Sequence, residues 1–351
     1  MIVLGIETSC DETAAAVVEN GTRTLSNVVV SQIDIHREFG GVVPELASRK
    51  HVESISIVIS KALQDACVGL HDIDAIAVTR GPGLIGSLLV GIGAAKGLSY
   101  ALKKPICAVN HLHGHLFASW LENDRMKFPF LGLVISGGHT SIFEVRTPLD
   151  IEIIGKTRDD AAGEAYDKVS KLLGLGYPGG AIIEKLAEGA STNGLRFPRA
   201  LMEPGNLDFS FSGLKTAVLR HTEKIFVNRY EKKIPGSFQQ ITPLEPSSDD
   251  YHHIRKIAAA FQEAVIDAVV KKLFMAVEIR KSTRVVVCGG VAANRALRNR
   301  VISEGLDRGI DIILPAISLC SDNGAMIAAR GYFLYQEGIV DSLDFGAKSR
   351  W

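Results

Sequence analysis

The sequence has few cysteines, no excess of charge and none of the commonest nucleotide-binding spacings. Its five cysteines form no C-x-x-C pair in 351 residues, which argues against a disulfide framework or a structural zinc module and favours a reducing compartment. Lysine plus arginine and aspartate plus glutamate each total 39, so only local basic patches would attract a polyanion. No G-x-x-x-x-G-K-[ST] motif occurs, which excludes a P-loop.

The N-terminus and the longest apolar run predict a cytoplasmic protein without a membrane span. "MIVLGIETSCDET" leads directly into strand-like sequence without a basic region, so no signal peptide is expected. Residues 84–102, "LIGSLLVGIGAAKGLSYAL", contain Lys96 and several glycines, which predicts a buried, closely packed helix. A chain of 351 residues is long for one hydrophobic core, so two domains are expected.

A repeat at a constant offset predicts that these two domains are related. Residues 4–18, "LGIETSCDETAAAVV", and residues 131–145, "LGLVISGGHTSIFEV", each read as strand, polar turn and strand. Later in each half, residues 73–110 and 283–315 read as strand, glycine turn, helix and strand, which implies parallel pairing with a right-handed crossover. We therefore expect an α/β protein whose two halves face each other across a cleft that binds ligands.

Three histidines lie within five positions in "NHLHGHLFASWL", residues 110–121. In a helix His111 and His115 share one face while His113 points away. Two such imidazoles form half of a metal site or a hydrogen-bonded cluster, and both readings remain open. The repeat indicates Asp322 as a third ligand, because it follows the closing strand of the second half, although an aspartate there also fits a helix N-cap. Two histidines and one carboxylate with open positions suit iron(II) or zinc.

Three glycine-rich loops in the second half favour a nucleotide-like ligand, because N–H groups at element ends can hold a phosphate. These loops are "VISGGHT" (134–140), "GYPGG" (176–180) and "CGGVAAN" (288–294). Asn294 fits either a ligand contact or a helix cap. Asp167 fits either a ribose hydroxyl or a pair with Lys171 one helical turn later.

Charged residues elsewhere are less specific. Asp11 and Glu12 lie in the turn that corresponds to "SGGHT", where carboxylates could hold a metal, orient a water or act as a base, or simply be solvated. Cys10 has no evident companion base and is expected to be structural. Short basic runs that could meet nucleic acid, but are more often solvated faces, occupy 48–51, 228–233 and 294–300. Residues 232–253 are Pro/Ser-rich and predict a loop, followed by a helix from 254.

Ten segments, in order along nearly the whole chain, resemble one family. They are "GIETSCDETAAAVV", "GGVVPELASRKHVE", "RGPGLIGSLLVG", "NHLHGH", "VISGGHT", "DDAAGEAYDKVSKLLGLGYPGG", "DFSFSGLKTAV", "FQEAVIDAVV", "CGGVAANRALR" and "SDNGAMIAARG". The sequence resembles the bacterial tRNA N6-adenosine threonylcarbamoyltransferases, formerly called O-sialoglycoprotein endopeptidases. The resemblance implies the actin-like ATPase (ASKHA) fold, with related α/β domains at 1–127 and 128–330, a loop insertion at 232–253, and a tail, 331–351, that returns to the first domain.

The resemblance also implies roles for particular residues. One divalent metal ion, with iron(II) favoured and zinc the alternative, is bound by His111, His115 and Asp322. Asp11 and Glu12 match acidic positions important for transfer. Threonylcarbamoyl-adenylate is contacted by Val134, Ile135, Ser136, Gly137, Gly138, Asp167, Gly180, Asn294 and Glu184, the last replacing an aspartate of some relatives.

The implied reaction transfers the threonylcarbamoyl group from threonylcarbamoyl-adenylate to the exocyclic amine of adenosine 37, just 3′ of the anticodon. The implied substrates are tRNAs that read codons starting with A, and AMP is released. The implied partners are an inactive paralogue and a small P-loop ATPase, with helix 84–98 as a candidate contact surface.

Three other functions compete with this reading. A metalloprotease would need the glutamate of H-E-x-x-H, whereas Leu112, His113 and Gly114 follow His111. A small-molecule kinase or ATPase of the actin-like class would leave the histidine–aspartate set without a role. A scaffold that only binds nucleotide would show neither metal content nor transfer activity.

Overall fold

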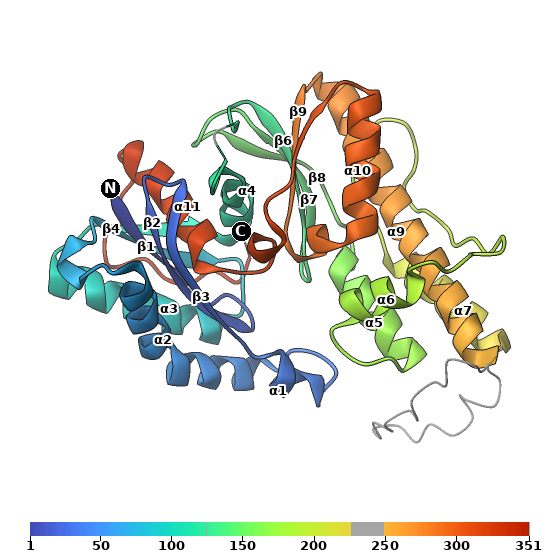
Figure 1. Cartoon of the computed structure of the whole chain (residues 1–351), viewed down its shortest axis with the longest axis horizontal. Helices are drawn as coiled ribbons and strands as arrows, with labels where there is room; N and C mark the ends of the chain where they lie inside the picture. Colours follow the sequence, from blue (N-terminus) through green and yellow to red (C-terminus); the bar gives the residue numbers. More distant parts are fainter. Residues whose placement is uncertain (124, 226–248, 351) are drawn as a thin grey trace.

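The computed structural model describes residues 1–123, 125–225 and 249–350, which form two five-stranded sheets and the helices around them (Figure 1). The first sheet has the order β3-β2-β1-β4-β5 and the second β8-β7-β6-β9-β10. The first comprises β1 (Ile2–Glu7), β2 (Glu12–Glu19), β3 (Arg23–Ser31), β4 (Ala75–Gly81) and β5 (Ile106–Asn110). The second comprises β6 (Phe130–Ile135), β7 (Thr140–Val145), β8 (Ile151–Lys156), β9 (Arg284–Cys288) and β10 (Asp311–Ile313).

The two sheets confirm the predicted repeat. β1 pairs antiparallel with β2 and parallel with β4, and β6 pairs antiparallel with β7 and parallel with β9. β4 and β5, like β9 and β10, are parallel and joined through a helix. The repeat did not identify the edge strands β3 and β8, whose residues are largely exposed or half-buried and so lack the continuous apolar run of a central strand.

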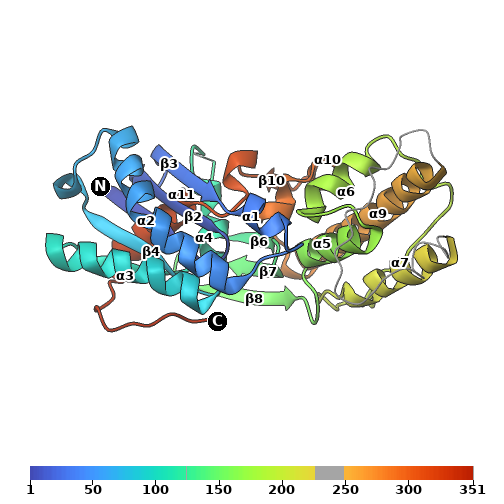
Figure 2. The same ribbon diagram turned by 90° about the horizontal axis from the view of Figure 1, so that it is seen from below.

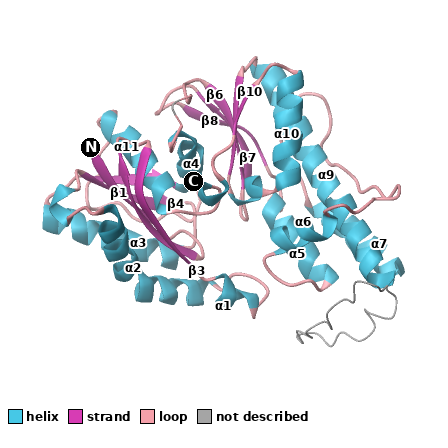
Figure 3. Ribbon diagram, viewed as in Figure 1, coloured by secondary structure: helices cyan, strands magenta, loops and turns pink. Residues whose placement is uncertain are grey.

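Helices lie on either side of each sheet, as Figures 1 and 3 show. They are α1 (Ile33–Arg37), α2 (Pro44–Ala66), α3 (Ile85–Leu102), α4 (His111–Phe117), α5 (Ala162–Leu173), α6 (Gly179–Ala187), α7 (Ser212–Ile225), α9 (Asp249–Arg280), α10 (Arg295–Asp307) and α11 (Gly324–Gln336). Short 3-10 turns occupy Leu70–Asp72, Ala118–Trp120, Gly290–Ala293 and Ile317–Leu319. Three apolar clusters fill the layers: between α2–α3 and the first sheet, around α4 and α11, and between the second sheet and α5–α10.

Helix α11 returns the chain to the first sheet. A Cβ on Gly5 of β1 would overlap Gly324 and Ala328 of α11, so the two backbones approach as closely as glycine allows. Residues 324–330, which the sequence assigned to the second domain, therefore pack on the first sheet. The tail follows, since Asp341 pairs with Ile106 and the Lys348 N–H donates to Arg80 O at 2.9 Å.

Helix α3 is only partly buried, contrary to the sequence prediction. Leu88 and Ile92 pack in the core, whereas Ile85, Leu89 and Tyr100 are 44%, 53% and 78% exposed. Within the described ranges it is the one helix long and apolar enough to cross a membrane by length and composition, with 33% of it buried. Its outer face is thus apolar and uncovered in the single chain.

The predicted Pro/Ser-rich loop is largely outside the described residues, which do not include 226–248. Its last five residues, 249–253, are not a loop, because they lie in the described part of α9 (Asp249–Arg280).

Candidate functional site

The predicted metal ligands come together between the two halves. His111 and His115 lie on α4, which starts where β5 ends, and Asp322 precedes α11. The His111 Nε2 and His115 Nε2 atoms lie 3.5 and 3.1 Å from Asp322 Oδ1, and one ligand atom of each residue lies within 4.8 Å of the others. The ring of His113 instead packs against Phe143, 6.1 Å between centroids. As the helical spacing predicts, His111 and His115 of α4 face Asp322 and His113 faces elsewhere.

The chemistry of this set fits a cation. His115 is 1% exposed, and apart from the approach of Nε2 to Asp322 Oδ1 at 3.1 Å its ring nitrogens have no partner, which costs about 1–3 kcal/mol for a buried polar group. A metal ion at this point would satisfy such a nitrogen. The alternative of Asp322 as an N-cap is wrong, because Asn323 caps α11 by accepting the Met326 N–H at 2.9 Å.

Glu7 orients the first histidine, and sequence reasoning missed it. Its carboxylate Oε2 lies 3.0 Å from His111 Nδ1, it accepts the Thr79 hydroxyl at 2.6 Å, and it is completely buried. The Ser9 N–H donates to the other oxygen. Because Nδ1 of His111 is engaged by Glu7, Nε2 is the ring nitrogen that faces Asp322 and is available to a cation. The only sequence signal was a glutamate at the end of β1, whose pairing with residue 111 depends on the strand order.

Charges within the cluster act strongly on one another. Burial lowers the pKa of His111, but the negative charges of Asp322 and Glu7 outweigh it and raise that pKa to about 9. Burial raises the pKa of Asp322, and the two ligand histidines outweigh it so that the net shift is downward. Burial and the neighbouring ligand histidines lower the pKa of His139 to about 4. His139 of "SGGHT", which was not singled out from the sequence, therefore adjoins the ligands as a neutral ring.

Asp11 and Glu12 lie beside the ligands at the turn between β1 and β2. Burial raises the pKa of Glu12 well above its ordinary value, and the charges of Asp322 and Asp11 and a hydrogen bond with Asp11 act in the same direction. His51 on α2 fixes this turn, with Nδ1 2.7 Å from Thr13 Oγ1 and Nε2 3.0 Å from Cys10 O. Asp11 is therefore a buried and Glu12 a half-buried neighbour of the candidate metal ligands.

The three glycine loops lie together around open space. Gly289 packs on the backbone of Ile135, and the Gly163 N–H at the start of α5 donates to Ser136 O at 3.2 Å. The Gly179 N–H donates to Asp167 Oδ1 at 2.7 Å. No atom lies within 4 Å of where a Cβ would stand on Gly137, Gly138, Gly180 or Gly290. Backbone N–H groups thus border a space that can take a ligand.

The remaining candidates have protein partners. Asn294 caps α10 by accepting the Leu297 N–H at 3.0 Å, and its amide donates to Gln262 Oε1 at 2.8 Å, so the capping alternative holds. Glu184 Oε1 accepts the Arg295 N–H at 2.7 Å. Burial raises the pKa of Asp167 to about 6, although its bond from Gly179 acts the other way.

The two halves also meet at the "GYPGG" loop. Arg37 Nε on α1 donates to Tyr177 O at 3.4 Å, and α1 lies beside α5 and α6 in Figures 1 and 2. Burial raises the pKa of the Tyr177 hydroxyl, and the charges of Asp11 and Asp167 raise it further. Tyr177, another residue that the sequence did not indicate, therefore connects the acidic turn with the second-half loops.

The basic runs that lie in the described residues consist partly of side chains with structural roles. His51 of the run 48–51 is buried, and residues 228–233 are outside the described ranges. In the run 294–300, Arg298 donates to Ala292 O and Pro315 O, and Arg300 pairs with Glu304. These two arginines thus have structural partners.

Comparisons with solved structures show the fold. The structure of full-length HypF in a phosphate- and nucleotide-bound form matches with a TM-score of 0.60 at 13% identity, over 95% of this chain and 55% of that one. The activator of 2-hydroxyisocaproyl-CoA dehydratase from Clostridium difficile, with bound ADPNP, matches with a TM-score of 0.50 at 12% identity, over 97% and 99% of the two chains. The predicted actin-like ATPase fold is confirmed.

Comparisons with sequences show the family. The family model described as tRNA N6-adenosine threonylcarbamoyltransferase matches residues 23–329. Proteins of that name from Clostridium beijerinckii and Syntrophus aciditrophicus are each 49% identical, over 347 and 352 residues. The matches cover 99% and 100% of this chain and 96% and 97% of those proteins. The chain therefore belongs to the tRNA N6-adenosine threonylcarbamoyltransferases, a family of enzymes that modify tRNA.

Proposed function

We propose that the chain transfers the threonylcarbamoyl group of threonylcarbamoyl-adenylate to the exocyclic amine of adenosine 37, in tRNAs reading codons that start with A. The observation that carries this proposal is the adjacency of three features: a histidine–aspartate set that fits a cation, the neighbouring acids Asp11 and Glu12, and glycine loops around open space. The family assignment supports the tRNA substrate.

The glycine loops are proposed to bind the adenylate. In this assignment the backbone at Gly137 and Gly138 holds the phosphate and the carbamoyl oxygen, because open space lies beside both glycines, and Val134, Ile135 and Ser136 lead into this turn from β6. Asp167 accepts a ribose hydroxyl, and Gly180 lets the ligand approach α6. Glu184 and Asn294 fix the start of α10 through their hydrogen bonds and lie beside the ligand in this proposal.

His111, His115 and Asp322 are proposed to hold one divalent ion, with iron(II) favoured and zinc the alternative. Imidazole and carboxylate ligands with open positions suit either ion. When bound, such an ion supplies Lewis acidity to a carbonyl oxygen and a fixed point for the threonylcarbamoyl group. Glu7 keeps His111 in the tautomer that this role requires.

Asp11 and Glu12 are proposed to handle the proton of the incoming amine. A C–N bond forms between N6 of adenosine and the carbamoyl carbon, and the bond from that carbon to the phosphate oxygen breaks as AMP leaves with the electron pair. Burial and the charges of Asp322 and Asp11 raise the pKa of Glu12, which makes its carboxylate a stronger proton acceptor than an exposed one. Positioning matters at least as much, since an aromatic exocyclic amine is a weak nucleophile.

The proposed partners are an inactive paralogue and a small P-loop ATPase, in the cytoplasm. Val52 and Ile57 of α2, and Ile85, Leu89 and Tyr100 of α3, are exposed apolar side chains on helices that pack against each other. Gly93 and Gly97 leave the middle of the α3 face open. Such a surface suits the equivalent helices of a related chain, because helices approach closely at small residues.

The test is a transfer assay with threonylcarbamoyl-adenylate, unmodified tRNA that reads codons starting with A, and the partner proteins. Formation of the modified nucleoside and AMP in equal amounts is expected. Hydrolysis of ATP without transfer would favour the actin-like ATPase alternative instead. An exposed-face variant, Leu89→Asp, is expected to lose stimulation by the paralogue while keeping the adenylate affinity.

A further inference from the structure

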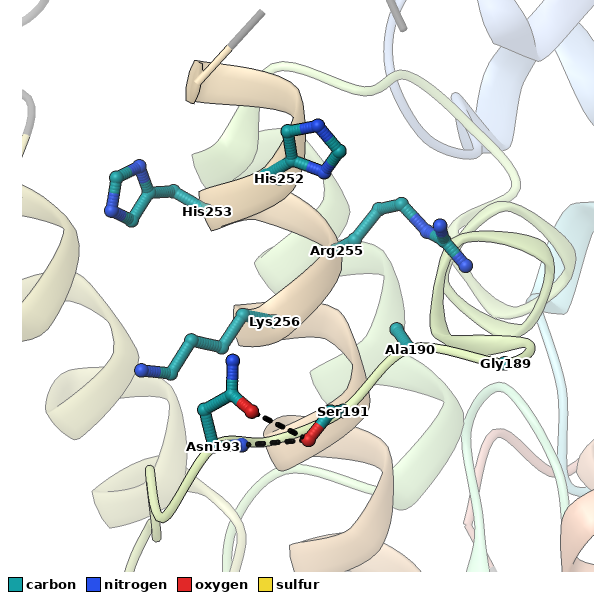
Figure 4. Close-up of a pocket in the computed structure, with 8 residues that line it drawn as sticks. All are labelled: Gly189, Ala190, Ser191, Asn193, His252, His253, Arg255 and Lys256. Carbon is teal, nitrogen blue, oxygen red and sulfur yellow. Dashed lines mark hydrogen bonds between the residues drawn. The ribbon is translucent and has the colours of Figure 1, made fainter. Parts of the chain in front are cut away.

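A cavity of about 330 Å³ lies on the second domain, and none of its lining residues belongs to the site described above (Figure 4). The loop after α6 and the first turns of α9 form it. Its lining residues are Gly189, Ala190, Ser191, Asn193, His252, His253, Arg255 and Lys256. The lining contains four basic side chains and no large apolar one, so the cavity suits an anion better than an apolar protein anchor.

Lys256 of this cavity and Lys224 of α7 act on the same histidine, His221 of α7. Burial lowers the pKa of His221, and the nearby positive charges of Lys256, Lys224 and His253 lower it further. Neither Lys224 nor Lys256 forms an ion pair with a carboxylate in the part of the chain that the structure describes. Like charges gathered without such pairing repel one another, and an anion bound among them would relieve that repulsion.

Arg255 and the α6 loop give the cavity a fixed frame. The Arg255 guanidinium donates to Leu186 O at 3.0 Å and to Glu188 O, which are carbonyls at the end of α6. Ser191 Oγ donates to Asn193 Oδ1 at 2.8 Å, which holds the loop in place. The loop therefore presents the side-chain N–H groups of Asn193 beside Lys256, and such groups commonly contact phosphate.

Helix α6 connects this cavity with the proposed adenylate-binding loop. Its N-terminal end is the Gly179–Gly180 step of the proposed adenylate loop, and its C-terminal end opens into the cavity at Gly189. A helix of nine residues spans about 14 Å. Because each step of a duplex strand advances about 3.4 Å, a cavity at this separation lies within a few nucleotides of a target base in an anticodon arm.

We propose that this cavity binds a backbone phosphate of the tRNA substrate, with Lys256 and Lys224 as its main cations. The chain carries no net charge, so a polyanionic substrate has to be held by local patches of this kind. The inference rests on the tRNA substrate that the family assignment gives, and not on the roles proposed for the metal ligands and acids.

The experiment measures the dissociation constant of unmodified tRNA for the full chain at several salt concentrations, by filter binding. Lys256→Gln is expected to weaken binding about fivefold and to lower the slope of log affinity against log salt by about one. The double variant Lys224→Gln/Lys256→Gln is expected to lower that slope by about two. The matched control is Lys271→Gln, an exposed lysine on the same helix that lines a different cavity.

The KM for threonylcarbamoyl-adenylate and the rate at saturating tRNA are expected to stay unchanged in both variants. Equal tRNA affinities and salt slopes for wild type, variants and control would overturn the proposal. Unchanged tRNA affinity with weaker stimulation by a partner protein would also overturn it and assign the cavity to that protein. A wild type that binds tRNA but transfers nothing would count against the proposed reaction alone, since the affinity comparison would still hold.

Discussion

The two halves of the molecule share a strand order but place different chemistry at corresponding turns. The turn between β1 and β2 carries Asp11, with Glu12 at the start of β2, and the turn between β6 and β7 carries Gly137 and Gly138. The first turn is held by hydrogen bonds of His51, whereas the second faces open space. The two turns thus occupy equivalent positions in the two halves, but one carries carboxylates and the other carries glycines beside open space.

The same comparison applies to the loops after the closing strands. β5 runs directly into the helix with His111 and His115, while β10 is followed by a loop that ends in Asp322. The two histidines thus come from the loop end of the first sheet and Asp322 from the segment that leads from β10 into α11, so the candidate ligand set closes only when α11 packs back on the first sheet beside α4.

The largest expected effect comes from removing a ligand. In His115→Ala, the metal content of the purified protein is expected to fall to near zero and the transfer rate to drop about 1000-fold, because both substrate orientation and Lewis acidity depend on the ion. Metal analysis and nucleoside quantification check this. His113→Gln on the same helix is the matched control, and an equal loss there would show that the helix rather than the ligand matters.

The second-largest effect is expected from Asp11, in the turn before β2. Asp11→Asn keeps the shape of the side chain but removes the proton acceptor, so the rate at saturating substrates is expected to fall about 100-fold with the metal content unchanged. Single-turnover kinetics with preloaded adenylate measure this directly. A variant that transfers at the wild-type rate would leave Asp11 without a catalytic role.

A substitution in the glycine turn of the second half is expected to change the KM for the adenylate rather than the transfer rate. Gly138→Val fills open space next to the proposed phosphate position, so the KM for the adenylate is expected to rise about 30-fold, as binding donors are obstructed. Gly213→Ala, another glycine with no neighbouring atom near its Cβ position, is the control on α7. Unaltered KM values in both variants would contradict the assignment of this turn to the adenylate.

A smaller effect is expected from the buried carboxylate behind the ligands. Glu7→Gln retains volume and an acceptor but loses the charge that holds His111, so metal affinity is expected to fall about 10-fold in competition with a chelator. Thr79→Val, which removes the hydroxyl bound to Glu7, is expected to give a weaker shift in the same direction. Identical affinities for wild type and Glu7→Gln would mean that the carboxylate has only a packing role.

The smallest effect concerns stability and pH. The pKa of Asp167 is raised to about 6 from an ordinary 3.8, so the folded state holds a proton that the unfolded state releases between these values. The contribution of Asp167 to stability is therefore complete below pH 3.8 and is lost as the pH rises through 6. Asp167→Asn is expected to stabilise the fold by about 1 kcal/mol at pH 7.5 and not at pH 3.5. Denaturant unfolding at both values checks the sign.

The sequence predicted much of this arrangement, and the reasons are visible in particular residues. Periodicity placed His111 and His115 on one face, and the repeat pointed to Asp322 although it lies more than 200 positions away. Glu7, Thr79 and His139 could not be found in the same way, because their contacts arise from strand order and turn geometry. The sequence also did not predict the exposed face of α3, because an apolar run is found both in helices buried in a core and in helices with an exposed apolar surface.

The most direct test is nucleoside analysis of tRNA after incubation with metal-depleted protein, threonylcarbamoyl-adenylate and the partner proteins, with iron(II) or zinc then added back. We expect wild type to form the modified adenosine only after metal is restored, and Asp322→Asn to form almost none under either condition. Full modification by the metal-depleted wild type would contradict a reaction centred on His111, His115 and Asp322.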